Sequence, residues 1–183
     1  MTILHIDSSI TGKNSASRAI SRSIVDNLRA VAPNAAVIAR DLVAEPLPHL
    51  TLDAFADTAV LDEFLAAETV VVGAPMYNFT LSTQLKSWLD RILVAGRTFR
   101  YTEAGPEGLA GGKRVIIALA RGGVYDAGSP SASLEHLESY LRGVFNFIGI
   151  DPEFVAADGL NFGPEQRAQS ISQALGETIR LAA

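Results

Sequence analysis

Residues 8–17 concentrate side chains that suit the binding of a phosphate group. Five of these ten residues carry a hydroxyl, among them Ser9, Ser15 and Ser17, and an apolar helical pattern follows. Free backbone N–H groups at a helix N-terminus attract anions, and small hydroxyls can donate to the same anion. A single N-capping serine would explain only one of these residues. Phosphate binding and simple capping both remain open here, while the glycine patterns of Walker and dinucleotide-binding loops are absent.

Residues 75–79 place aromatic side chains in a turn. They read Pro-Met-Tyr-Asn-Phe, follow the apolar run 70–74 and precede an amphipathic stretch that begins near Leu81. Pro75 has no backbone N–H, so it is expected to end a buried strand. Apolar rings in a turn are costly to leave in water. We therefore expect Tyr77 and Phe79 to be covered by a flat ligand, or to pack against a neighbouring loop or subunit.

A third segment offers backbone groups instead of side chains. Gly122 and Gly123 follow the apolar run 115–119. Without a Cβ atom, such residues let their backbone N–H groups approach a ligand closely. A glycine pair taken alone is equally typical of a turn, so its meaning depends on its neighbours in the fold.

The alternation of strands and helices predicts where these segments lie. Expected strands are residues 3–6, 36–39, 69–74, 115–119 and 154–157, and expected helices are about 20–33, 61–67, 81–96, 131–147 and 164–181. This alternation predicts an α/β fold with a parallel sheet and helices on both faces. We expect one flavodoxin-like domain over residues 1–183, with strand order 2-1-3-4-5.

In that order, the loops after the first, third and fourth strands meet at one sheet edge, where ligands bind in such folds. A phosphate site, aromatic rings and close backbone amides would then line one pocket. This combination describes flavin mononucleotide (FMN), and it favours a ligand over the simpler interpretation of each segment.

Composition argues against several other functions. The chain has no cysteine, which excludes disulfides, thiolate catalysis and iron–sulfur ligation. Its three histidines lack ligand spacing, so we expect no metal site. A net charge of −5 with scattered cations argues against nucleic-acid binding. The mean hydropathy of +0.22 comes without an apolar run long enough to span a membrane, so we expect a cytoplasmic protein whose apolar surface favours oligomerisation.

Several motifs resemble the FMN-dependent NADH:quinone oxidoreductase and azoreductase family. They are Pro-Met-Tyr-Asn-Phe at 75–79, Leu-Lys-x-Trp-x-Asp at 85–90, Ala-Gly-x-Thr-Phe-x-Tyr-Thr at 95–102, Gly-Pro-x-Gly-Leu at 105–109 and Arg-Gly-Gly at 121–123. The resemblance implies a flavodoxin-like homodimer with FMN near the subunit interface. It also implies reduction of quinones and azo compounds, with NADH or NADPH as the electron donor.

The resemblance further implies which residues contact FMN. They are Ser9, Ser15, Ala16, Ser17, Met76, Tyr77, Asn78, Phe79, Ala120, Arg121, Gly122 and Gly123. Ala120 departs from the family pattern, which has serine, so a hydroxyl contact is lost there. The connection between Asp41 and Thr69 is also shorter than in the family, and this difference bears on the choice of substrate.

In this interpretation the flavin carries the chemistry, and no side chain is assigned as a general acid or base. Asn78 is the candidate near flavin N5, and the amides of Gly122 and Gly123 would stabilise negative charge on the reduced ring. Phe99 is a candidate wall of the substrate site, contributed by the opposite subunit, or else part of the dimer core. A non-catalytic electron carrier or flavin-binding module remains an alternative on the same fold, and a hydrolase is a weaker one.

Overall fold

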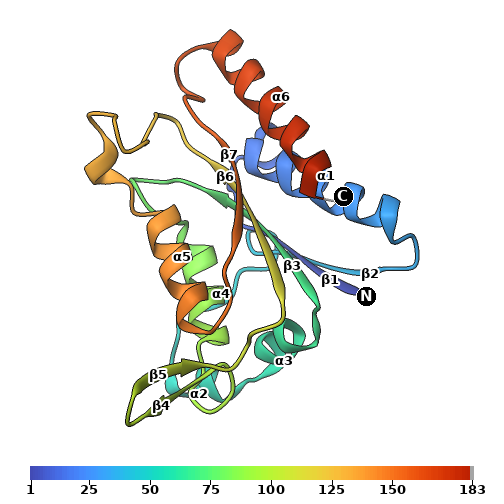
Figure 1. Ribbon diagram of the computed structural model, residues 1–183, viewed down its shortest axis with the longest axis vertical. Helices are drawn as coiled ribbons and strands as arrows, with labels where there is room; N and C mark the ends of the chain where they lie inside the picture. The colour runs from blue at the N-terminus through green and yellow to red at the C-terminus, as the bar shows by residue number, and fades with distance from the viewer. Residues whose placement is uncertain (182–183) are drawn as a thin grey trace.

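A five-stranded parallel sheet forms the centre of the protein. The computed structural model describes residues 1–181 (Figure 1). The strands are β1 (Thr2–Asp7), β2 (Ala36–Asp41), β3 (Thr69–Pro75), β6 (Arg114–Ala120) and β7 (Glu153–Ala157), in the order β2-β1-β3-β6-β7. The β-branched runs of β3 and β6 lie in the middle, where both faces of a strand are buried.

Helices cover both faces of the sheet, as expected. Figure 1 shows α1 (Ala16–Val31) and α6 (Pro164–Leu181) on one face, and α3 (Ala59–Ala66), α4 (Thr83–Ile92) and α5 (Glu138–Phe147) on the other. Successive strand residues point to opposite faces, so Ile3 belongs to the core beneath α1, whereas Leu4 and Ile6 belong to the core beneath α4 and α5. No helix within residues 1–181 combines the length and apolarity that crossing a membrane requires.

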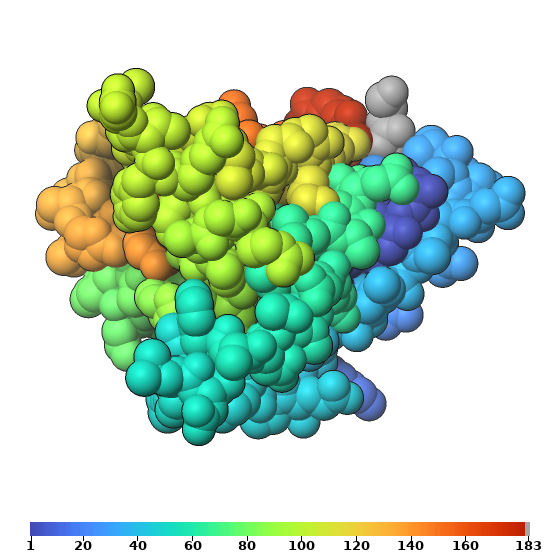
Figure 2. All heavy atoms as spheres, turned by 90° about the horizontal axis from the view of Figure 1, so that it is seen from below, coloured from blue at the N-terminus to red at the C-terminus, as the bar shows by residue number. Residues whose placement is uncertain are grey.

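A β-hairpin was missed by the sequence analysis. It consists of β4 (Phe99–Thr102) and β5 (Gly105–Gly108), which pair antiparallel within the glycine-rich connection. Because β4 and β5 come between β3 and β6 in the chain, the fourth and fifth strands of the parallel sheet are numbered β6 and β7. The predicted order 2-1-3-4-5 counted only the strands of this sheet, so its numbering differs from the observed order β2-β1-β3-β6-β7. Figure 2, seen from below, shows the hairpin beside α3 and the short helix α2 (Leu52–Ala56), which was not predicted either.

Two predicted helix boundaries were wrong for identifiable reasons. The helix α4 ends at Ile92 instead of near Gly96, because the buried Thr98 hydroxyl donates to the Ile92 carbonyl at 2.7 Å and accepts from the Val94 N–H at 3.0 Å. The helix expected from residue 131 begins only at Glu138, after a separate 3₁₀ turn. The Glu135 carboxylate accepts hydrogen bonds from the first N–H groups of α5 and thereby caps it.

Candidate functional site

The loops that leave β1, β3 and β6 meet at the carboxyl edge of the sheet around a cavity of about 370 Å³. Its lining residues are Ser9, Thr11, Asn14, Ser15, Ala16, Pro75, Met76, Tyr77, Ala120, Gly122, Leu160, Asn161 and Arg167. This volume lies within the range of small-molecule sites. Polar and apolar residues contribute about equally to its lining.

Hydroxyl groups gather at the start of α1. The Ser15 side chain caps this helix by accepting from the Arg18 N–H at 3.2 Å, so capping explains one serine. The Ser17 hydroxyl is buried beside it, 3.1 Å from the Ser15 hydroxyl, and the Ser9 hydroxyl lies 3.0 Å from that of Thr11. Only one of these four hydroxyls is needed for the cap. Of the others, the hydroxyls of Ser9 and Thr11 lie in the cavity lining and are available to an anion at the helix N-terminus, whereas Ser17 is fully buried and does not line the cavity.

Arg18 holds this loop from behind. Its guanidinium donates to the Ser9 carbonyl at 2.9 Å and to both carboxylate oxygens of Asp41, at 2.7 and 2.8 Å. The hydrogen bonds from Arg18 lower the pKa of the Asp41 carboxyl to about 2. The bidentate pair joins α1 to the end of β2 and fixes the Ser9 backbone at the cavity wall.

A larger open groove of about 860 Å³ lies on the other side of the same loop, between α1 and β2. Its lining includes Arg18, Asp7 and Asp41, where the single guanidinium is shared between two carboxylates. Neither the aromatic turn nor the glycine loop lines it. We therefore assign the candidate site to the smaller cavity, where the three loops converge.

The aromatic turn is held in an unusual backbone conformation. Asn78 and Phe79 have φ angles of +47° and +74°, which residues other than glycine rarely adopt. The Tyr77 hydroxyl accepts a hydrogen bond from the Ile10 N–H at 3.1 Å, and the Phe79 carbonyl accepts one from the His136 N–H at 3.0 Å. Such strain persists only where surrounding contacts impose it, and it concentrates at ligand sites. Both strained residues are exposed and directly follow Tyr77, but neither is among the residues that line the cavity.

The glycine loop pairs with the segment that follows β7. The Gly122 carbonyl accepts from the Asn161 N–H at 3.0 Å, and the Gly123 carbonyl accepts from the Gly159 N–H at 2.9 Å. A Cβ atom on Gly122 would collide with the Asn161 side-chain amide. A side chain at position 122 would therefore displace the Asn161 amide from the close contact between these two loops.

The Arg121 side chain points away from the cavity, into a cluster of carboxylates. Its guanidinium binds Asp158 in a bidentate pair at 2.6 and 2.8 Å and lies 3.4 Å from Glu138. Burial alone would lower the pKa of the Arg121 guanidinium, but Asp158, Glu138 and Glu135 outweigh it and raise that pKa. This side chain fixes the loop instead of lining the cavity, so a ligand contact at Arg121 would have to use the backbone.

Comparison with known proteins gives the family. A family model described as having a flavodoxin-like fold matches residues 1–181. FMN-dependent NADH:quinone oxidoreductase 2 of Bradyrhizobium diazoefficiens is 52% identical, with both chains covered in full, and so is a namesake from Sinorhizobium fredii. The chain belongs to the FMN-dependent NADH:quinone oxidoreductase family. An azoreductase structure from Bacillus anthracis, 28% identical, has a TM-score of 0.91 over 100% of this chain and 98% of its own.

This member of the oxidoreductase family is shorter than its relative. The alignment with the Bradyrhizobium protein runs over 201 positions, whereas the chain has 183 residues. That the shortening lies in the connection between Asp41 and Thr69 stays a prediction. In the structure this connection contains α2 and α3, on the side of the molecule away from the cavity.

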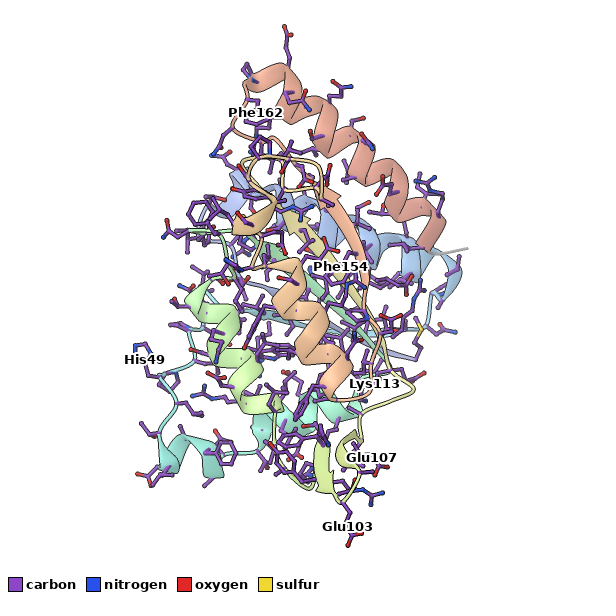
Figure 3. The ribbon with its side chains drawn as sticks, turned by 60° about the vertical axis from the view of Figure 1, so that its left-hand side comes forward. His49, Glu103, Glu107, Lys113, Phe154 and Phe162 are labelled. Atoms are coloured by element: carbon purple, nitrogen blue, oxygen red, sulfur yellow. The ribbon has the colours of Figure 1, made fainter. Side chains whose placement is uncertain are left out.

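Seven of the predicted contact residues line the cavity of this oxidoreductase: Ser9, Ser15, Ala16, Met76, Tyr77, Ala120 and Gly122. Ser17 is buried behind them, and Arg121 and Gly123 lie in the adjoining loop. Phe99 lies elsewhere, packed 4.7 Å from the ring of Phe147. Its hairpin is at the far end of the molecule, as Glu103 and Glu107 show in Figure 3, opposite Phe162 near the cavity. Phe99 therefore does not line the cavity of its own chain.

The cavity is also lined by residues of the β7–α6 segment that no sequence pattern indicated. Leu160, Asn161 and Arg167 come after the last strand, whose loop was not expected at the ligand edge. The backbone pairing of this segment with the glycine loop brings it there. No motif marked these positions, and only the packing of α6 on α1 places Arg167 against the serine-rich loop.

Proposed function

We propose that this protein is an FMN-dependent oxidoreductase that passes two electrons from NADH or NADPH to quinones and azo compounds. We further propose that it works as one domain, in two alternating half-reactions at a single site. The chemistry supplied by bound FMN would be acceptance of a hydride from the nicotinamide and transfer of two electrons to the acceptor. The protein would bind, orient and electrostatically tune this group.

The observation that carries the proposal is the convergence of three chemically different loops on one cavity. Ser9 and Ser15 supply hydroxyls beside a helix N-terminus, which suits a phosphate. Met76 and Tyr77 supply an apolar wall, which suits a flat ring. Gly122 supplies a backbone that approaches without a side chain. The names of the relatives, which specify FMN, support the same group.

Residues of the aromatic turn and the glycine loop would tune the ring. We propose that Asn78 lies beside flavin N5, because it is exposed, has a strained backbone and directly follows Tyr77, which lines the cavity. The N–H groups of Gly122 and Gly123 would stabilise negative charge on the pyrimidine side of the reduced ring. No side chain is assigned as a proton donor, so solvent would supply protons.

We also propose that the enzyme is a cytoplasmic homodimer. An apolar groove on α4 and α5, lined by Leu93, Tyr140, Val144 and Phe147, supports an interface there, because such surface is costly in water. Phe99 packs against Phe147, so a partner bound at this face would lie close to Phe99. Phe99 could then contribute to the partner's substrate site. Sedimentation equilibrium of the wild type and of Val144→Glu tests the interface.

The activity is tested by steady-state oxidation of NADH and NADPH by the FMN-loaded protein, against a panel of quinones and azo dyes. Turnover with both acceptor classes is the expected result. Yellow protein that binds FMN but leaves NADH unoxidised would favour the electron-carrier alternative. Protein that cannot be reconstituted with FMN would refute both, and ester turnover without flavin would indicate a hydrolase.

A further inference from the structure

Arg167 lies at the hydroxyl-rich end of the cavity, in the first turn of α6. Its Nη2 donates a hydrogen bond to the Asn14 carbonyl at 2.6 Å. Asn14 ends the 3₁₀ turn Gly12–Asn14 and directly precedes Ser15, the N-cap of α1. The Arg167 guanidinium therefore reaches across from α6 to the N-terminal end of another helix.

The charge of this guanidinium is not neutralised by the protein. Arg167 is the one charged residue among those that line the cavity, and within residues 1–181 no carboxylate pairs with it. The arginines that hold the neighbouring loops differ, because Arg18 pairs with Asp41 and Arg121 with Asp158. The contact of Arg167 with a carbonyl leaves its full positive charge facing the cavity.

In the absence of a ligand, the Asn14 carbonyl is the only polar group of the described residues recorded as binding this guanidinium, and the nearby helix N-terminus opposes its charge. The N-terminus of a helix carries partial positive charge, so a guanidinium beside the first turn of α1 is repelled by it. An anion bound between the guanidinium and the helix N-terminus makes the electrostatic interaction favourable. The helix dipole, the serine hydroxyls and the guanidinium then all attract the same group. The arrangement is thus explained by an anion that is bound in the functional state.

We propose that Arg167 binds the phosphate group of FMN directly and so makes the enzyme select FMN over riboflavin. This inference rests on the proposed function, because it requires FMN in this cavity. A guanidinium presents its N–H groups as a planar fork that matches phosphate oxygens. Arg167 would keep its contact with Asn14 through one N–H group and use the others for the phosphate.

The test compares FMN and riboflavin, which differ only in the phosphate. The full-length protein is freed of flavin and titrated with each ligand while flavin fluorescence is followed. We expect Arg167→Ala to weaken FMN binding roughly 10- to 100-fold, the range for losing hydrogen bonds to a charged group. Riboflavin binding should change by less than about twofold. Arg180→Ala, at the exposed end of the same helix, is the matched control and should change neither.

Two further variants separate direct binding from a role in holding the loop. Arg167→Lys keeps the charge, whereas Arg167→Gln keeps a donor for the Asn14 carbonyl and loses the charge. Direct binding predicts that lysine retains more FMN affinity than glutamine. It also predicts that added salt weakens FMN binding more in the wild type than in the glutamine variant.

The outcomes distinguish this inference from the proposed function. Wild-type protein that binds neither flavin would overturn both. In a second outcome, the wild type binds FMN more tightly than riboflavin, and Arg167→Gln shows the same preference and the same salt dependence of FMN binding. That result would overturn the role of Arg167 but leave the proposed function standing. An equal loss of FMN and riboflavin affinity in Arg167→Ala would likewise assign Arg167 to holding the loop.

Discussion

Replacement of Arg121 by methionine should destabilise the folded protein strongly, although Arg121 lies outside the cavity. The guanidinium is buried and compensates Asp158, at 2.6 and 2.8 Å, and Glu138, at 3.4 Å. Methionine fills much of the same volume without charge, so the variant leaves Asp158 without its cation, whereas Glu138 keeps Arg142 at 2.9 Å. Loss of one partner from a buried ion pair typically costs about 3–5 kcal/mol.

The cost should lie near the lower end of that range. The side chains of Asp158 and Glu138 are 22% and 30% exposed, so water can partly solvate the carboxylates that remain. We therefore expect a loss of about 3 kcal/mol in the free energy of unfolding. For a chain of this size, that loss corresponds to a decrease of about 6–12 °C in Tm.

Urea and thermal unfolding of flavin-free protein at pH 7 measure this loss. Arg100→Ala is the control, because Arg100 pairs with Glu107 at 2.8 Å on the exposed hairpin, where water screens the pair and its loss should change stability little. Asp158→Asn should be less damaging in the Arg121→Met background than in the wild type, since it removes the unpaired carboxylate. A loss below about 1 kcal/mol in Arg121→Met, or strictly additive effects of the two changes, would refute this account of the cluster.

Two further predictions concern the support of the serine-rich loop. Asp41→Asn should lower the free energy of unfolding by about 1 kcal/mol at pH 6, after allowance for solvent screening, because Arg18 lowers the pKa of the Asp41 carboxyl from 3.8 to about 2. Since that stabilisation is lost as the pH falls, urea unfolding should show the difference between variant and wild type shrinking between about pH 4 and pH 2. Gly73→Ala should cost roughly 1–3 kcal/mol, because a Cβ atom there would lie 2.6 Å from the Asp7 carboxylate. Gly128→Ala, which meets nothing within 4 Å, should be nearly neutral, and equal Tm values for the two alanine variants would contradict this packing argument.

The parts of the site that follow directly from sheet topology could be predicted from the sequence. Buried strands with β-branched runs are recognisable, and the carboxyl ends of neighbouring parallel strands must share an edge. The predicted five-stranded parallel sheet was confirmed on this basis. The serine-rich loop, the aromatic turn and the glycine loop were consequently expected together, and residues such as Ser9, Tyr77 and Gly122 line one cavity.

Other parts depend on contacts that local patterns do not encode. The strands β4 and β5 are four residues each and mostly exposed, so they lack the apolar alternation that identifies a strand. The partner of Arg121 is 37 residues away, and Arg167 reaches a loop 153 residues earlier in the chain. Long-range pairs of this kind arise from the packing of α6 on α1 and the pairing of loops, which periodicity cannot reveal.

The arginines around the cavity divide according to what neutralises them. Arg18 and Arg121 approach the ligand loops from behind, and carboxylates on adjacent strands or loops neutralise both of them. Arg18 and Arg121 fix the loop backbones through these contacts. The hydroxyls and N–H groups on the cavity side therefore need not hold the loops in place. Arg167 approaches from the cavity side and contacts only a carbonyl within the described chain. The proposed FMN site needs this division, because a carboxylate beside Arg167 would repel the phosphate group that we propose is bound at the helix N-terminus.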